Sequence, residues 1–377
     1  MRFVLFVHSL LSDWNNGNAH FLRGVARDLA ARGHEVRVCE PAEGWSRTNL
    51  LAEPEGPAML AEIRDTFPEL ASGLRAYGPE GPDLDAALDG ADVVLVHEWN
   101  PPDLVARIGR ARAAGGRFRL LFHDTHHRSA TAPADMAAFD LSAFDGVLAF
   151  GSAVAERYRA MGWAHRVWTW HEAADTRLFQ PFPDVTPVRD LVWIGNWGDE
   201  ERTAELHEFL LEPVRRLRLS ADVHGVRYPD AARMALAASG VRYRGWLPNH
   251  RVPQVFAGHR VTVHVPRRPY AAALPGIPTI RVFEALACGI PLVSAPWDDV
   301  EELFKPGRDF LIARTGRAMA VALHGLLADP QAAAELARQG RETVLARHTC
   351  AHRVDQLLGI CAELGAPGSF LALAEVS

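Results

Sequence analysis

Cysteine is scarce in this sequence. Its 377 residues include four cysteines, Cys39, Cys288, Cys350 and Cys361. Their positions show neither the paired spacing of a zinc-binding motif nor the density of an extracellular disulfide framework. Unpaired thiols in a reducing compartment are the simpler interpretation, so we expect a cytoplasmic protein.

Long apolar runs are also absent. None approaches the roughly 20 residues that a membrane-spanning helix requires. The apolar run at residues 1–8 is too short for a signal peptide, and it leads into Asp13 and Asn15 rather than a small-residue cleavage site. We therefore expect no signal peptide and no integral membrane segment.

An excess of positive charge is missing as well. Lysine and arginine total 40 against 46 aspartates and glutamates, which gives a net charge of −6. This balance argues against nucleic acid or an anionic membrane as a partner. The length suggests two domains at roughly one per 150 residues, and the 48% hydrophobic content is ordinary for a globular protein.

The first half of the chain alternates between apolar strand-like runs and amphipathic helical segments. Such alternation predicts βαβ units and a parallel sheet that binds ligands at the carboxyl ends of its strands. We expect this first domain to span residues 1–185. The expected strands are residues 3–7, 35–39, 91–97, 118–122 and 144–151, and the expected helices are residues 19–32, 104–114 and 153–161.

Polar residues follow two of these strands directly. One strand ends in His97 and is followed by Glu98, and a denser cluster from His123 to Arg128 comes after the next. Ionisable groups at the carboxyl edge of a sheet favour a functional site. A zinc or iron site is one alternative, since imidazole and carboxylate are usual ligands of those metals, and a set of structural loop histidines is another.

The second half begins after a proline-rich segment, residues 182–188, which we take as the domain boundary. A strand at residues 190–194 runs into the glycine-containing turn at 195–198, and Arg202 is expected in the first turn of a helix that reaches residue 217. Glycines at such a turn let a ligand approach the backbone, and a nearby arginine suits phosphate. Arg267 and Arg268 are expected in a loop, where they would offset the charge of a diphosphate or remain solvated.

Residues 276–297 predict a loop, a short helix, a tight turn and a buried strand. Pro278 can start the helix, and Gly289 ends it. The helix N-terminus favours an anion, and Arg281 and Glu284 share one face of the helix. A guanidinium suits a diphosphate and a carboxylate suits ribose hydroxyls, whereas a solvated arginine–glutamate pair on an ordinary amphipathic helix is the alternative.

This segment, with Arg281, Glu284, Gly289 and Pro291 in register, resembles the donor-binding segment of glycosyltransferases with the GT-B fold, in particular the group-1/family-4-like and CgeB-like proteins. Many family-4 members carry two glutamates eight positions apart, and here Gly276 replaces the upstream one. The resemblance implies an α/β fold with two Rossmann-like domains facing a cleft, the second spanning residues 186–348. It also implies a crossover helix and tail at 349–377 that return to the first domain.

The resemblance further implies a nucleotide-sugar donor on the second domain and a small-molecule or glycan acceptor on the first. His123 matches the catalytic-region histidine, and Asp124 would orient or polarise it. The expected acceptor-binding residues are Gly17, Asn18, His97, Glu98, His126 and His127. The expected donor-binding residues are Gly195, Asn196, Trp197, Arg202, His224, Gly225, Leu247, Arg268, Gly276, Ile277, Pro278, Thr279, Arg281 and Glu284.

On this basis we expect a glycosyltransferase of the hexosyltransferase type that retains the anomeric configuration. We expect neither a metal nor a cofactor beyond the nucleotide sugar that serves as co-substrate. A nucleotide-sugar 2-epimerase on the same fold is one alternative, and a non-catalytic nucleotide-sugar-binding module is another.

Overall fold

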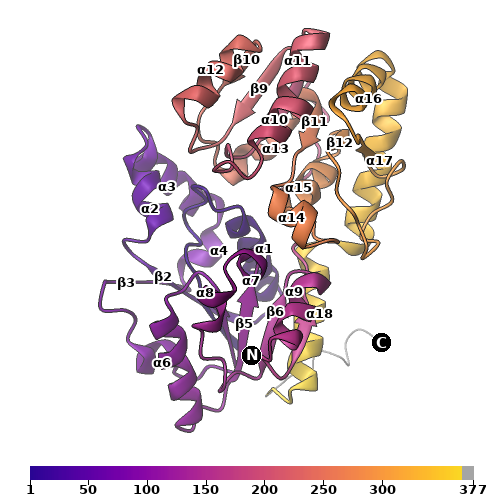
Figure 1. The fold of residues 1–377 in the computed structure, drawn as a ribbon. Coiled ribbons are helices and arrows are strands. Elements are labelled where there is room, and N and C mark those ends of the chain that lie inside the picture. The colour runs from indigo at the N-terminus through magenta and orange to yellow at the C-terminus, as the bar shows by residue number, and fades with distance from the viewer. Residues whose placement is uncertain (367–377) are drawn as a thin grey trace. The chain divides into compact units, whose positions relative to one another are not determined.

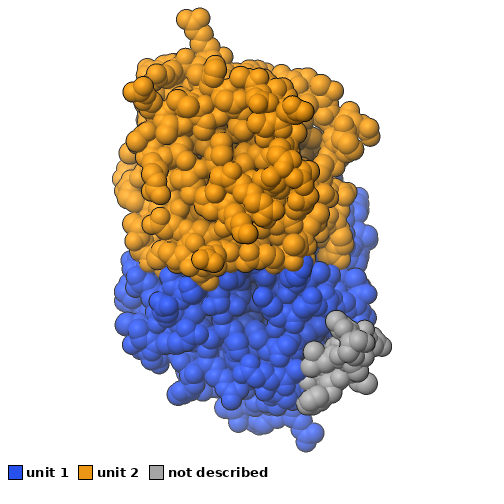
Figure 2. Space-filling view, turned by 90° about the vertical axis from the view of Figure 1, so that its right-hand side faces the viewer, with its two compact units in different colours: residues 1–172, 350–377 blue, residues 173–349 orange. Residues whose placement is uncertain are grey.

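The computed structural model describes residues 1–366 and divides the chain into two compact units. Unit 1 comprises Met1–Glu172 together with the chain from Cys350 onward, and unit 2 comprises Ala173–Thr349 (Figure 2). The domain limits expected from the sequence, residues 1–185, 186–348 and 349–377, stay a prediction, and the tail at 367–377 lies outside the described residues. Within the described part of the chain, no helix is long and apolar enough to cross a membrane.

Unit 1 is built on a parallel sheet with the strand order β3-β2-β1-β4-β5-β6-β7. Figure 1 labels β2, β3, β5 and β6 of this sheet. Its central strands are continuous apolar runs, as expected where helices cover both faces of a parallel sheet. All five residues of β4 are buried. The strands are β1 (Arg2–Phe6), β2 (Glu35–Pro41), β3 (Leu74–Tyr77), β4 (Val93–His97), β5 (Arg119–Asp124), β6 (Gly146–Ala149) and β7 (Val167–Thr169).

The helices of unit 1, apart from the last one, lie in the connections between these strands. They are α1 (Asn18–Ala31), α2 (Trp45–Ala52), α3 (Gly56–Thr66), α4 (Pro68–Ala71), α5 (Leu84–Leu88), α6 (Pro102–Ala113), α7 (Arg128–Thr131), α8 (Pro133–Ala137), α9 (Ser152–Ala160) and α18 (Cys350–Glu363). Because parallel strands all end at one edge, the loops after β1, β4 and β5 meet there. The segments that carry His97 and His123 are therefore neighbours, as predicted.

Helix α18 belongs to unit 1 although it lies at the far end of the chain. The indole Nε1 of Trp170 donates to the carbonyl of Arg353 at 2.8 Å, and Nε of Arg353 donates to the carbonyl of His171 at 2.9 Å. The side chain of Arg32, after α1, forms an ion pair with Asp355. The predicted return of the last helix to the first domain is confirmed.

Unit 2 contains a second parallel sheet, with the strand order β10-β9-β8-β11-β12-β13. Both units therefore have the Rossmann-like architecture that the sequence predicted. The strands are β8 (Arg189–Ile194), β9 (Ala221–His224), β10 (Val241–Tyr243), β11 (His259–His264), β12 (Leu292–Ser294) and β13 (Leu311–Ile312). The helices are α10 (Thr203–Leu206), α11 (Glu212–Leu217), α12 (Asp230–Ala238), α13 (Val252–Ala257), α14 (Arg268–Ala273), α15 (Ile280–Cys288), α16 (Gly316–Ala328) and α17 (Pro330–Arg347), with a 3₁₀ turn η2 (Asn249–Arg251) before α13.

The first helix of unit 2 differs from its prediction in two ways. Arg202 is the N-cap of α10, with φ −151°, rather than part of the first helical turn. Between α10 and α11 the chain forms a π-helical segment, η1 (His207–Leu211). Pro213 follows closely and has no N–H to donate back to a carbonyl, which leaves the preceding turn free to widen.

Candidate functional site

The turn after β8 is held in place by Arg202. Its Nη1 donates to the carbonyl of Val265 at 2.9 Å, and its Nη2 donates to the carbonyl and to Oδ1 of Asn196, both at 2.8 Å. The guanidinium lies over the ring of Trp193, 5.1 Å from its centroid. Burial, with Arg267 nearby, lowers the pKa of Arg202 to about 9. These contacts show that Arg202 fixes the shape of the 195–198 turn.

The two arginines after β11 are ion-paired with glutamates. Arg267 donates to Glu201 at 2.8 Å and to Oδ1 of Asn196 at 3.0 Å. Arg268 is the first residue of α14 rather than a loop residue, and its exposed side chain donates to Glu205 at 2.9 Å. A role for Arg268 at a diphosphate therefore requires it to leave Glu205, and it stays a prediction.

Three loops approach closely at this edge of the second sheet. His224 ends β9, and its carbonyl accepts from the N–H of Gly195 at 2.8 Å. A Cβ at Gly225 would lie 2.0 Å from the carbonyl oxygen of Gly195, so only glycine fits there. Burial lowers the pKa of His224 to about 4. The half-buried Leu247 lies in the loop after β10, and Trp197 is buried in the core of unit 2.

Helix α15 has an N-terminus without a side-chain cap. Thr279 is its N-cap residue, but its hydroxyl lies 3.2 Å from Nε2 of His264 and forms no capping bond. The first N–H groups of a helix need partners, and the helix dipole favours an anion there. Gly289, with φ 68°, ends the helix as predicted.

His264 is a site residue that sequence reasoning missed. It is 3% exposed at the end of β11, and its Nδ1 lies 2.9 Å from the hydroxyl of Ser294 on β12. Burial lowers its pKa to about 3, so the imidazole is neutral at physiological pH. The imidazole therefore connects the ends of β11 and β12 to Thr279, the N-cap residue of α15. A polar residue inside the apolar run 261–265 was the signal available in the sequence.

The loop that precedes α15 explains why position 276 is glycine. Gly276 has φ +87°, and a Cβ there would lie 2.9 Å from Cγ of Glu301 and from Cγ2 of Val300. Its N–H donates to the carbonyl of Asp298 at 2.7 Å, and Nε1 of Trp297 donates to the carbonyl of Ile277 at 3.0 Å. A glutamate at 276 would need a different loop.

Arg281 and Glu284 form an ion pair on one face of α15, as their spacing predicted. The side chain of Glu284 is fully buried and that of Arg281 is 16% exposed, so the solvated pair considered as an alternative is not what the structure shows. A buried ion pair adds little net stability, because desolvation offsets the attraction between the charges. The pair therefore stands as a candidate ligand-binding feature.

In unit 1, His123 on β5 is a buried histidine in an aromatic environment. It is 1% exposed, and its Nε2 has no hydrogen-bond partner within residues 1–366. Its ring centroid lies 4.9 Å from Trp170, 5.3 Å from His97 and 6.0 Å from Phe21. Burial lowers its pKa to about 3, so this nitrogen is held neutral.

Asp124 does not orient His123, contrary to the expectation from the sequence. Adjacent residues of a strand point to opposite faces of the sheet. The carboxylate of Asp124 accepts from the hydroxyl of Tyr158 at 2.9 Å and from the backbone N–H of His126 at 3.0 Å. Burial raises its pKa to about 6. Tyr158 is a partner that the sequence analysis did not identify.

Asn18 and His97, both expected to bind the acceptor, lie in contact with each other. The side-chain nitrogen of Asn18, which follows Gly17 at the start of α1, lies 2.7 Å from Nε2 of His97. The hydroxyl of Thr125 lies 3.0 Å from the same nitrogen. His97 and His123 are paired in the register of β4 and β5.

Glu98 is fully buried and ion-paired with Arg128. Burial, with Asp124 nearby, raises the pKa of Glu98 to about 8.

The rings of His126 and His127 lie 4.0 Å apart, and Nδ1 of His127 is 2.9 Å from the hydroxyl of Thr131. Over residues 1–366, no group of three or more His, Cys, Asp and Glu side chains has the arrangement of a metal site.

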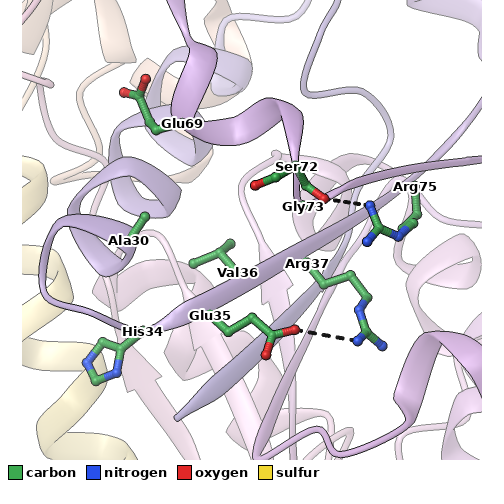
Figure 3. A pocket seen from close by; sticks show the side chains of 9 residues that line it. All are labelled: Ala30, His34, Glu35, Val36, Arg37, Glu69, Ser72, Gly73 and Arg75. Carbon is green, nitrogen blue, oxygen red and sulfur yellow. Dashed lines mark hydrogen bonds and ion pairs between the residues drawn. The ribbon is translucent and has the colours of Figure 1, made fainter.

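A cavity of about 280 Å³ lies elsewhere in unit 1, at the amino-terminal end of β2 (Figure 3). None of the predicted site residues lines it. Its arginines and glutamates already have partners: Arg37 lies 3.5 Å from Glu35, Glu69 is ion-paired with Arg27, and Arg75 donates to the carbonyl of Ser72 at 2.7 Å. The predicted site residues of unit 1 lie instead at the carboxyl ends of the strands, at the opposite edge of the sheet.

Two family models match the chain one after the other. The model described as Glycosyltransferase Family 4 matches residues 15–178, and the model described as Glycosyl transferase-like matches residues 202–359. The chain belongs to the glycosyltransferases with the GT-B fold, as the resemblance of residues 281–291 predicted. No curated protein sequence matches it.

Solved structures show the same fold. HepE of Anabaena, solved in complex with UDP and glucose, is 14% identical, with 96% of this chain and 100% of that chain covered and a TM-score of 0.67. Sucrose-phosphate synthase from Thermosynechococcus elongatus is 15% identical over 97% and 99% of the two chains, with a TM-score of 0.65. An alpha-glucosyltransferase in complex with UDP and a 13-mer DNA containing an HMU base is 10% identical over 96% and 99%, with a TM-score of 0.69.

Proposed function

We propose that this glycosyltransferase moves a hexose from a UDP-sugar to an acceptor hydroxyl. The observation that carries the proposal is the start of α15, where an N-terminus without a side-chain cap lies on the same short helix as the buried Arg281–Glu284 pair. Uridine as the base is favoured by the fold relatives, since HepE and the alpha-glucosyltransferase were both solved with UDP.

In this mechanism the donor lies on unit 2. The diphosphate accepts hydrogen bonds from the first N–H groups of α15 and from Arg281, and Glu284 accepts from the ribose hydroxyls. The 195–198 turn, His224 with Gly225, and Leu247 complete the donor site. Stabilising the charge that develops on the leaving diphosphate is the main electrostatic task in such a transfer.

The acceptor lies on unit 1. Its hydroxyl oxygen forms the new bond to the anomeric carbon while the bond from that carbon to the diphosphate oxygen breaks, and the hydroxyl proton passes to the departing diphosphate. In this proposal Nε2 of His123, which has no hydrogen-bond partner within residues 1–366, bonds to a sugar hydroxyl, and Asn18 and His97 bind the acceptor. We propose a retaining reaction with no bound metal. Turnover in the presence of a chelator tests whether the reaction needs a metal.

A cytoplasmic location completes the proposal. The four cysteines are buried and none of them forms a disulfide, as expected of a protein from a reducing compartment. The family models do not favour the 2-epimerase or the non-catalytic module. Product analysis separates these alternatives from the transferase, because an epimerase converts the UDP-sugar without any acceptor and a binding module converts nothing.

The test uses Glu284→Ala. UDP-sugars should raise the melting temperature of the wild-type protein, since a ligand at a hundredfold over its dissociation constant stabilises by about 2.7 kcal/mol. The variant should lose most of that shift and most of its turnover, because the ribose then has no carboxylate partner. The matched control is Glu335→Ala, which removes a glutamate from an exposed pair of the same spacing with Arg338. An unchanged shift in Glu284→Ala would remove this residue from the donor site.

A further inference from the structure

Two tryptophans of unit 1 are unusually exposed for their size. Trp99 is 43% exposed and Trp45 is 47% exposed. Trp99 follows the carboxyl end of β4, and Trp45 begins α2, soon after the carboxyl end of β2. Open α/β sheets bind ligands at the carboxyl ends of their strands, so both tryptophans offer exposed apolar surface where a ligand of this unit would lie.

Trp99 is held in one orientation by its neighbours. The guanidinium of Arg128 lies 4.3 Å from the centroid of its ring, and the ring of His126 meets it edge-on at 4.9 Å. Arg128 is itself fixed by its ion pair with the buried Glu98. A rigid aromatic side chain loses little conformational entropy when a ligand packs on it.

Trp45 is supported in a comparable way. The ring of Trp14 meets it edge-on at 5.0 Å, with an interplanar angle of 75°. Trp14 is buried, and its Nε1 donates to Glu53 at 2.8 Å. The second exposed indole therefore also rests on a fixed partner.

The loop after β1 lies between the two tryptophans. The ring of His8 is 6.4 Å from that of Trp99, and its carbonyl oxygen lies 3.3 Å from where a Cβ of Gly44, the residue before Trp45, would be. Strands β2 and β4 flank β1. With strands about 4.8 Å apart, the edge from β2 to β4 is roughly 10 Å wide, which is longer than a single sugar ring.

The arginines along this edge are already engaged by carboxyl groups. Arg128 pairs with Glu98, Arg23 pairs with Asp13, and Arg47 lies 4.0 Å from Glu40. A ligand rich in phosphate would need guanidinium groups that do not already bond to carboxyl groups of the protein. The edge therefore suits a neutral ligand that carries hydroxyl groups.

From these observations we infer that the acceptor is a neutral oligosaccharide of at least two rings, stacked on Trp99 and Trp45. The face of an indole ring is electron-rich and attracts the polarised C–H groups on one face of a sugar ring, while the sugar hydroxyls remain free to bond to polar groups. His123, whose Nε2 is buried and unpartnered, lies on the strand next to the one that Trp99 follows. This inference rests on the proposed transferase function and names the class of its acceptor.

The experiment measures binding of the full-length protein to an immobilised array of glucose, maltose, maltotriose, cellotriose and chitotriose, with a 13-mer DNA duplex as the charged comparison. We expect trisaccharides to bind more tightly than glucose. Trp99→Ala and Trp45→Ala should each weaken trisaccharide binding at least fivefold, and Trp99→Phe and Trp45→Phe should restore most of it. Met161→Ala, which removes an exposed apolar side chain elsewhere, is the control.

The inference is overturned if no neutral saccharide on the array binds, if only the DNA duplex binds, or if the alanine variants bind trisaccharides as the wild type does. UDP-glucose binding, measured in parallel by thermal shift, should be the same in all the tryptophan variants. If UDP-glucose and the other UDP-sugars fail to bind while trisaccharide binding depends on both tryptophans, the proposed donor fails and the saccharide surface stands.

Discussion

At the scale of single residues, the two units place buried polar groups at the carboxyl edges of their sheets, and burial sets the protonation of these groups. His123 and His264 each have a pKa of about 3, whereas Glu98 is raised to about 8. Desolvation is the largest cause in every case, because burial disfavours the charged form of any group. The histidines are consequently neutral hydrogen-bonding groups rather than cations.

His123→Ala tests the role of one such group. Losing a single hydrogen bond to a sugar hydroxyl should lower kcat/KM about tenfold to a hundredfold, without changing the affinity for UDP. Steady-state kinetics on folded protein, verified by circular dichroism, measure the effect. His324→Ala changes an exposed histidine of α16 and should leave kinetics unaltered. Equal activity of His123→Ala and wild type would show that His123 takes no part in transfer.

At the scale of elements, the loop before α15 depends on a backbone conformation that only glycine adopts easily. Gly276 combines a positive φ with close contact to Glu301 and Val300. The N–H of Gly276 donates to the carbonyl of Asp298, and Nε1 of Trp297 donates to the carbonyl of Ile277. These bonds link the shape of the loop to the start of the helix.

Gly276→Ala should therefore weaken UDP-sugar binding roughly 5- to 30-fold, since a left-handed conformation costs a residue with a Cβ about 1–2 kcal/mol. Isothermal titration with UDP-glucose measures the change. Gly325→Ala is the control, because a Cβ there meets nothing within 4 Å inside α16 and should be neutral or stabilise by up to about 1 kcal/mol. Wild-type affinity in Gly276→Ala would mean that this loop does not shape the donor site.

At the scale of the whole molecule, the buried histidines make stability depend on pH. The pKa of His264 is about 3 in the folded protein, against the ordinary value of 6.5 that an unfolded chain would have. As pH falls below 6.5 the unfolded chain binds a proton that the folded protein does not, so stability decreases from pH 6.5 toward pH 3. His123 and His224 act in the same direction. Glu98 acts in the opposite direction, because its pKa is raised in the folded protein. The folded protein therefore loses stability as pH rises toward 8.

The midpoint of urea unfolding should accordingly be lower at pH 5 than at pH 7. His264→Gln should show a smaller difference between the two pH values, because glutamine keeps a hydrogen-bonding side chain that does not titrate. Unfolding followed by tryptophan fluorescence gives both midpoints. An identical pH dependence in His264→Gln and the wild type would contradict the burial of a neutral His264.

The sequence by itself determined the two parallel sheets, the end of α15 at Gly289 and the spacing that pairs Arg281 with Glu284. Apolar runs, glycine turns and helical periodicity are local signals, and local signals suffice to specify elements. The resemblance of residues 281–291 gave the glycosyltransferase class, which the two family models confirm.

Only the tertiary structure decided which side chains meet. It joined Asp124 to Tyr158 rather than to His123, engaged Arg202 with the backbone, and linked His264 to Thr279. These partners lie 15 to 63 positions apart along the chain. Their contacts depend on the face of each strand and on the path of each loop, and neither of these can be read from a local pattern.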